Sequence, residues 1–124
     1  MDKYLYQDLT GRIIALCFKI HNQLGYGCPE KIYQKALEIE LADCQIPFKR
    51  EVYSKILYGG KIAGRFFLDF LVDDKVAVEL KVRRNVYESD WIQLLNYLKS
   101  TNKKLGILIV FTREKVQIKR VINK

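Results

Sequence analysis

Two rows of apolar residues at every second position constrain the fold of this chain most strongly. Both rows lie in FFLDFLVDDKVAVELKV, residues 66–82. Positions 66, 68, 70 and 72 are Phe, Leu, Phe and Val, and positions 76, 78, 80 and 82 are Val, Val, Leu and Val. A repeat of two places each row on one face of a β-strand. The stretch therefore predicts two antiparallel strands joined by a tight turn.

The register of the two strands also determines where their charged residues lie. The two apolar rows share a face only if paired positions add up to an even number, which requires an odd loop such as the three residues 73–75. This register places Asp69 opposite Glu79, with Lys81 two residues along on the same face. A two-residue loop would instead turn Asp69 into the apolar row of the second strand, where an unpaired carboxylate is costly. The apolar pattern thus predicts two neighbouring carboxylates.

Neighbouring carboxylates repel each other unless a cation or a proton lies between them. Magnesium suits such a pair, because it is usually bound by one or two carboxylates together with water and phosphate oxygens. Lys81 would then stabilise the negative charge that develops when water attacks a phosphodiester, or help to position that water. The alternative is a surface ion pair between Lys81 and one carboxylate on a solvated face. Helices on both faces of the sheet would favour the metal site over this alternative.

Helical periodicity appears before and after the strands. A first helix is expected from residue 4 to 24, ended by the glycines of LGYG, and a second begins near Pro29 and ends before QIP. A third covers about 89–100. The apolar positions expected to form the buried stripes of the first two helices are Leu9, Ile13, Leu16, Cys17, Ile20 and Leu24, and Ile32, Ala36, Ile39 and Ala42.

The remaining segments read as strands. FKREVYSKILY and the two strands of 61–82 form a three-stranded meander, LGILIVF is a buried strand, and KVQIKRVI is a half-exposed one. The order α-α-β-β-β-α-β-β predicts an α/β domain with a mixed sheet flanked by helices. With 124 residues, the chain is expected to form one domain, 1–124.

Composition limits the classes of protein that remain. Apolar residues make up 49% and charged residues 29%, which excludes a disordered or fibrous chain. No apolar run is long enough to cross a membrane, so we expect a cytoplasmic protein. Three cysteines, without a CxxC spacing, indicate free thiols. A formal net charge of +8 favours a polyanionic partner such as nucleic acid, although many small basic proteins bind none.

The pattern LDF…VELKV resembles the signature of the PD-(D/E)XK nuclease superfamily, with Asp69, Glu79 and Lys81 at its three charged positions. Leu68 stands where the superfamily usually has proline, a change that removes no metal-binding group. The resemblance implies a restriction-endonuclease-like core and a nuclease that depends on Mg²⁺ or Mn²⁺. It also implies Asp69 and Glu79 as metal ligands.

A second motif resembles the GxxExxY family within that superfamily. Gly27, Glu30 and Tyr33 match its name, and IHNQLG, with His21 and Gly25, also fits the family pattern. The resemblance makes Glu30 a further catalytic residue and metal ligand, with Tyr33 on the same helical face. The alternative for Glu30 is a favourable charge at the positive end of a helix. For His21 we favour a packing role over that of a general base, so it is only a supporting residue.

The third helix carries Gln93 and Tyr97 on one face, which resembles the Gln-x-x-x-Tyr motif of several nuclease branches. Such a glutamine would orient a ligand, and such a tyrosine would donate to a phosphate. An ordinary polar helix face is the alternative. Related sequences often carry a histidine shortly before this glutamine, where Asp90 stands here. The apolar residues expected to face the core are Trp91, Leu94, Leu95 and Leu98.

The sequence therefore predicts a metal-dependent nuclease, with DNA favoured over RNA, no membrane contact and a homodimer left open. Two alternatives remain: a nucleic-acid-binding module without catalysis, and an interaction protein whose acidic cluster only stabilises the fold. The basic residues predicted to contact phosphates, with a solvated basic face as the alternative, are Arg83, Arg84, Arg113, Lys115, Lys119 and Arg120.

Overall fold

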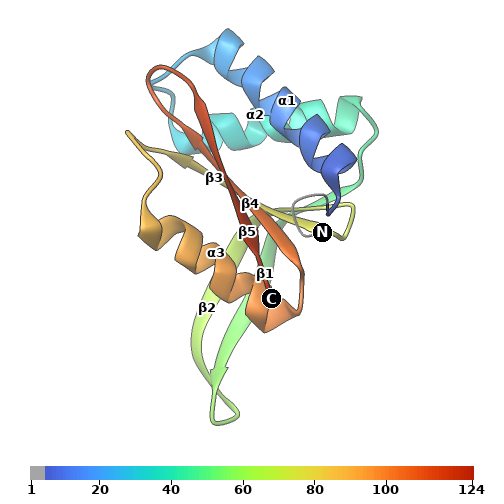
Figure 1. Cartoon of the computed structure of the whole chain (residues 1–124), viewed down its shortest axis with the longest axis vertical. Helices are drawn as coiled ribbons and strands as arrows, with labels where there is room; N and C mark the ends of the chain where they lie inside the picture. The colour runs from blue at the N-terminus through green and yellow to red at the C-terminus, as the bar shows by residue number, and fades with distance from the viewer. Residues whose placement is uncertain (1–4) are drawn as a thin grey trace.

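A five-stranded mixed sheet forms the middle layer of the structure, and helices cover both of its faces (Figure 1). The computed structural model describes residues 5–124. The helices are α1 (Gln7–Leu24), α2 (Glu30–Asp43) and α3 (Glu88–Thr101). The strands are β1 (Phe48–Tyr58), β2 (Lys61–Val72), β3 (Val76–Val82), β4 (Leu105–Phe111) and β5 (Val116–Ile122). The predicted order of elements is confirmed.

The strands are arranged in sequence order, β1-β2-β3-β4-β5. Only the β3–β4 pair is parallel, and the other three pairs are antiparallel. A parallel pair needs a crossover, which α3 provides between β3 and β4. The predicted meander of β1, β2 and β3 is thus confirmed, and β4 lies between β3 and β5 with all seven residues buried.

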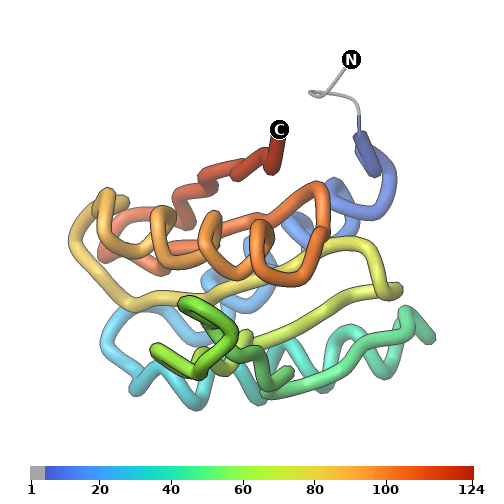
Figure 2. The backbone as a smooth tube through the Cα atoms, turned by 90° about the horizontal axis from the view of Figure 1, so that it is seen from below, coloured from blue at the N-terminus to red at the C-terminus, as the bar shows by residue number. Residues whose placement is uncertain are grey.

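Two hydrophobic clusters lie on the two sides of the sheet. Figure 2 shows α3 in orange on one side of the strands and α2 in cyan on the other. The cluster beneath α1 and α2 includes Ile13, Cys17, Tyr33, Leu37, Phe70, Val72, Val78, Leu80 and Phe111. The cluster beneath α3 includes Phe66, Leu68, Leu71, Ala77, Leu94, Tyr97 and Leu108. Helices therefore do cover both faces, the arrangement that favours a metal site over a surface ion pair.

The prediction that positions 66–72 keep one apolar row on one face is wrong. Phe66 and Leu68 pack in the cluster beneath α3, whereas Phe70 and Val72 pack beneath α1 and α2. The row changes face at residue 69, and the neighbouring strand changes with it. Glu51 of β1, the position that would face residue 69, has a left-handed backbone with φ 51° and is missing from the paired positions. Arg50 pairs with Phe70 and Val52 with Leu68, so the register is the same on both sides of this position and the two strands change face together without an inserted residue.

The buried stripe of α2 also differs from the expected one. Tyr33, Leu37 and Leu41 are buried, whereas Ile32 and Ile39 are 40% and 50% exposed. Both stripes have helical spacing, so periodicity alone could not separate them. The stripe that begins with the tyrosine buries more surface, because an aromatic ring and two leucines fill the space over the sheet.

The stripe of α1 agrees better with the prediction. Ile13, Cys17 and Ile20 are buried, while Leu24 at the end of the helix is 39% exposed. Within the described residues, none of the helices is both long and apolar enough to span a membrane. The cysteines Cys17, Cys28 and Cys44 are free, as expected.

The contact between α3 and β4 gives a direct test of the packing. A methyl group on Gly106 would lie 2.9 Å from Cγ and Cδ2 of the buried Leu94. We expect Gly106→Ala to lower the free energy of unfolding by about 1–3 kcal/mol, because the fully buried leucine must shift to make room for the methyl group. Urea denaturation measures this change.

Gly11→Ala is the matched control. This glycine lies within α1, and nothing would come within 4 Å of an added methyl group. The substitution should raise the free energy of unfolding by about 0.5–1 kcal/mol, because alanine favours the helix. Equal effects of the two substitutions would contradict the tight α3–β4 contact.

Candidate active site

Asp69 and Glu79 bind crosswise to the backbones of each other's strands. The Asp69 N–H donates to Oε1 of Glu79 at 2.7 Å, and the Leu80 N–H donates to Oδ2 of Asp69 at 2.8 Å. The paired Cα positions of β2 and β3 end at Phe70–Val78, just before this point. Carboxylate oxygens thus hold the two strands together where the backbone pairing stops.

The predicted register of the hairpin is confirmed. Val72 pairs with Val76 and Phe70 with Val78, so the loop has the three residues 73–75. Asp73 and Asp74 in this loop have positive φ angles of 52° and 57°, which turns the chain tightly. The pairing places Asp69 opposite Glu79, although the side chains meet the partner strand's N–H groups.

Burial makes both carboxyl groups hard to ionise. Glu79 is 4% exposed, and this burial, together with the neighbouring Asp69 charge, raises the pKa of Glu79 to about 8. Burial also raises the pKa of Asp69. The hydrogen bond from the Leu80 N–H favours the charged form and offsets part of this rise. The pair therefore holds a proton at neutral pH unless a cation compensates for the charge.

Lys81 and Glu30 act on this pair through their charges. The positive charge of Lys81 lowers the pKa of both Asp69 and Glu79, and the negative charge of Glu30 raises both. Neither the Lys81 side chain nor the Glu30 side chain has a hydrogen bond or ion pair with any residue from 5 to 124. Glu30 is the first residue of α2 and Lys81 lies near the end of β3, so separate elements bring these charges toward the carboxylates.

Two residues that the sequence analysis did not select also contact Asp69. Gln34 donates from Nε2 to Oδ1 of Asp69 at 3.1 Å, and Arg50 donates from Nε to the Asp69 backbone oxygen at 3.2 Å. Arg50 also pairs with Glu38 at 2.8 Å. Gln34 follows Glu30 by one helical turn, so the i, i+4 spacing could have identified it. Arg50 became a neighbour only through the β1–β2 register.

Tyr33 and His21 lie in the core beside the site. The Tyr33 hydroxyl donates to the Gly25 oxygen at 2.5 Å, and its ring stacks on Phe111 with 4.3 Å between centroids. His21 donates from Nε2 to the Thr112 oxygen at 2.8 Å, and its ring stacks on the same Phe111. These contacts fit the packing role favoured for His21. They give Tyr33 a packing role as well, and they fasten the connection before Glu30 to the end of β4.

Among the described residues, no hydrogen bond or ring contact joins Gln93 or Tyr97 to the carboxylate pair. Tyr97 is 3% exposed, and its ring packs on Phe66 at 5.6 Å in the cluster beneath α3. Gln93 is exposed, and its side chain has no hydrogen bond among the described residues. Asp90, where related sequences have histidine, is 7% exposed and pairs with Arg83 at 3.2 Å. The Gln-x-x-x-Tyr spacing here forms part of the core and an outer helix face.

The six predicted basic contacts divide into two groups. Three are engaged by other residues: Arg83 pairs with Asp90, Lys119 lies 5.1 Å over the Trp91 ring, and Arg120 donates to the Leu5 oxygen at 3.1 Å. Lys115 is exposed in the β4–β5 turn. Arg84 and Arg113 line a cleft of about 450 Å³ together with Tyr26 and Glu114.

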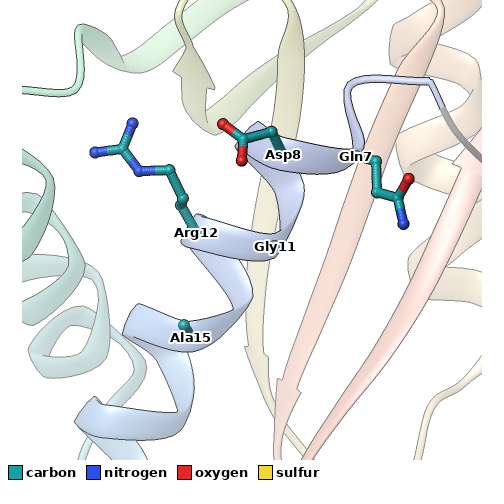
Figure 3. A pocket seen from close by; sticks show the side chains of 5 residues that line it. All are labelled: Gln7, Asp8, Gly11, Arg12 and Ala15. Carbon is teal, nitrogen blue, oxygen red and sulfur yellow. The ribbon is translucent and has the colours of Figure 1, made fainter.

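A second hollow, of about 530 Å³, lies over the first turns of α1 (Figure 3). It is lined by Gln7, Asp8, Gly11, Arg12 and Ala15. In Figure 3 the side chains of Asp8 and Arg12 project from one side of the helix, and that of Gln7 projects the other way. None of the predicted site residues lines this hollow.

The donor set at the carboxylate pair suits a hard divalent cation. Asp69, Glu79 and Glu30 offer only oxygen ligands, and Oε2 of Glu79 accepts no hydrogen bond from the residues that the structure describes. Across residues 5–124, no three His, Cys, Asp or Glu side chains are already arranged as a metal site. Two carboxylates completed by water and substrate oxygens fit Mg²⁺ better than an all-protein cage would.

A family model and a solved structure are both similar to this chain. The family model described as "PD-(D/E)XK nuclease superfamily" matches residues 7–121. No curated protein is similar enough to count as a match. The crystal structure of SSO0001 is similar with a TM-score of 0.61 and 22% identity, over 76% of this chain and 50% of that chain. This chain thus spans half the length of SSO0001, and the similarity confirms the predicted restriction-endonuclease-like α/β fold.

The raised pKa of Glu79 predicts how stability depends on pH without metal. The folded protein keeps the Glu79 proton up to about pH 8, whereas the unfolded chain loses it near the ordinary value of 4.5. Stability should therefore fall as pH rises through this window, by about 1.4 kcal/mol for each pH unit. Glu79→Gln keeps the hydrogen-bond acceptor but removes the titration, so its profile should be flatter and its stability at pH 8 higher.

Urea unfolding in a chelator, between about pH 5 and pH 8, measures these profiles. Glu88→Gln is the control, because it removes an exposed carboxylate at the start of α3 and should keep the wild-type slope. The same slope in wild type and Glu79→Gln would show that Glu79 is not the group that takes up the proton.

Proposed function

Because the chain belongs to the PD-(D/E)XK nuclease superfamily, we propose that it hydrolyses nucleic acid phosphodiesters with a divalent metal ion, Mg²⁺ or Mn²⁺. The observation that carries this proposal is the buried pair of Asp69 and Glu79, linked crosswise to the backbones of β2 and β3. The positive charges of Lys81 and Arg50 lie near the pair, yet the pKa of both carboxyl groups stays raised. A divalent cation would compensate for the remaining negative charge.

Asp69 and Glu79 would hold the metal ion, and Glu30 would complete the ligand set directly or through a water molecule. A bound divalent cation supplies Lewis-acid polarisation of the phosphate. Gln34 orients Asp69 through its hydrogen bond to Oδ1. Lys81 carries an ammonium group without an ion pair in the described part of the chain, so it is available to a phosphate or to the attacking water. There it would stabilise the charge that develops in the transition state.

Several finer assignments belong to the same proposal. Gly27, Glu30 and Tyr33 match the GxxExxY motif, so we assign the chain to that family within the superfamily. DNA is the favoured substrate over RNA, and the net charge of +8 supports binding to either polyanion. One domain over residues 1–124, a cytoplasmic location and a homodimer stay predictions.

A module that binds nucleic acid without cutting it is the alternative function. It shares the basic surface, including Arg84 and Arg113 of the cleft. The presence of Asp69, Glu79 and Lys81 together favours catalysis, because a superfamily member that has lost its activity is expected to lack the lysine or one carboxylate.

Substitution of Lys81 tests the proposed reaction. Lys81→Ala should reduce metal-dependent nicking of plasmid DNA by about 100-fold or more, because charge stabilisation in the transition state is lost. Binding of Mn²⁺ should be retained, since the lysine is not a ligand. Glu79→Gln should lose both cleavage and metal binding. Nicking assays and calorimetric titration with Mn²⁺ measure these two properties separately.

Lys61→Ala is the matched control, because it removes an exposed lysine at the start of β2 and should keep wild-type activity. An active Lys81→Ala protein would contradict the proposed role of the lysine. A wild-type protein that cleaves neither DNA nor RNA with Mg²⁺ or Mn²⁺ would favour the binding module.

A further inference from the structure

Three connections build the cleft of about 450 Å³. Tyr26 comes from the α1–α2 connection, Arg84 from the β3–α3 connection, and Arg113 and Glu114 from the β4–β5 turn. Figures 1 and 2 both show these connections gathered on one side of the molecule, away from the two termini. The cleft is thus a feature of the fold, made by segments far apart in the sequence.

Short stretches of chain link the cleft to the candidate active site. Tyr26 stands four residues before Glu30, and Arg84 stands three residues after Lys81. The Arg83 N–H donates to the Phe111 oxygen at 3.3 Å, which ties the β3–α3 connection to the end of β4. The hydrogen bond from His21 to Thr112 ties α1 to the same turn. A substrate held at the carboxylate pair would therefore extend along this edge.

The groups that line the cleft are available to a ligand. Tyr26 is 43% exposed. Arg84, Arg113 and Glu114 have no hydrogen bond or ion pair with any described residue, and Glu114 does not neutralise either arginine. Arg83, next to Arg84 in sequence, is instead held by Asp90. An aromatic ring, two guanidinium groups and one carboxylate therefore face the same space without partners.

We propose that this cleft binds one unpaired nucleotide next to the phosphodiester that is cleaved. The inference rests on the proposed nuclease function and names its substrate class, a nucleic acid with a single-stranded end or segment. The base stacks on Tyr26, the phosphate lies between Arg84 and Arg113, and Glu114 accepts a hydrogen bond from an amino group of the base.

Size and shape distinguish an unpaired nucleotide from a duplex. A volume of about 450 Å³ is in the lower part of the range of small-ligand sites, and it has room for one nucleotide. Stacking on a tyrosine also requires a base whose face is exposed, which a base inside a duplex does not offer. The cleft therefore selects single strands.

Binding in a chelator, where no cleavage takes place, tests the inference on the full chain. The probes are short single strands of DNA and of RNA that carry the fluorescent base 2-aminopurine, and a blunt DNA duplex. We expect single strands to bind more tightly than the duplex and 2-aminopurine fluorescence to fall on binding. Tyr26→Ala should weaken single-strand binding about tenfold and abolish the quenching, whereas Tyr26→Phe should keep both.

Matched variants separate stacking from general effects. Tyr58→Ala removes an 84% exposed tyrosine at the tip of the β1–β2 hairpin and should bind like wild type. Arg84→Ala should weaken binding to single strands, whereas Arg12→Ala, in the hollow over α1, should not. Circular dichroism confirms that each variant is folded.

The outcomes also separate this inference from the nuclease proposal. Tyr26-dependent binding to DNA, to RNA or to both supports the cleft, and the probe that binds identifies the sugar, even if the protein cleaves nothing. Equal binding of Tyr26→Ala and wild type overturns the inference, even if the protein is an active nuclease. A preference for the blunt duplex overturns it as well.

Discussion

The crossed hydrogen bonds between Asp69 and Glu79 and the backbones of the opposite strands are the constraint on which the rest of the site depends. They replace backbone pairing at the point where β2 and β3 separate, and they hold two acids in a buried place. Each bond lowers the cost of burying a carboxylate, but burial still raises the pKa of both groups. Without metal the raised pKa of Glu79 keeps a proton on the pair at neutral pH, and the proposed function has a divalent cation take the place of that proton.

The packing of α1 and α2 on the sheet positions further residues around the carboxylate pair. Phe111, at the end of β4, is stacked by Tyr33 on one helix and by His21 on the other. The hydroxyl and ring nitrogen of these residues then fasten the backbone at Gly25 and Thr112. As a result, α2 begins beside the carboxylates, and two residues one turn apart on it, Glu30 and Gln34, act on Asp69. Packing in the core thereby positions the charges of the site.

Much of the fold could be predicted because local patterns determine it. The alternation of apolar residues along 66–82 was enough to predict the odd number of loop residues and the position of Asp69 opposite Glu79. What failed depended on contacts that no local pattern contains. Half of the β2 row lies on the other face of the sheet, changing at the position opposite the left-handed Glu51, and α2 buried the stripe of Tyr33 instead of that of Ile32. Tyr97 has the spacing of a site residue but lies in the core beneath α3, because that side of the helix packs on the sheet.

The location of a divalent cation tests the central claim most directly. Crystals soaked in Mn²⁺ would show its position through anomalous scattering, independently of any activity. The account predicts one strong peak bound by carboxylate oxygens of Asp69 and Glu79, with Glu30 in direct contact or one water molecule away. It predicts no such peak in Glu79→Gln. A wild-type crystal with Mn²⁺ bound elsewhere, or with the carboxylate pair unchanged and no metal at saturating concentration, would contradict it.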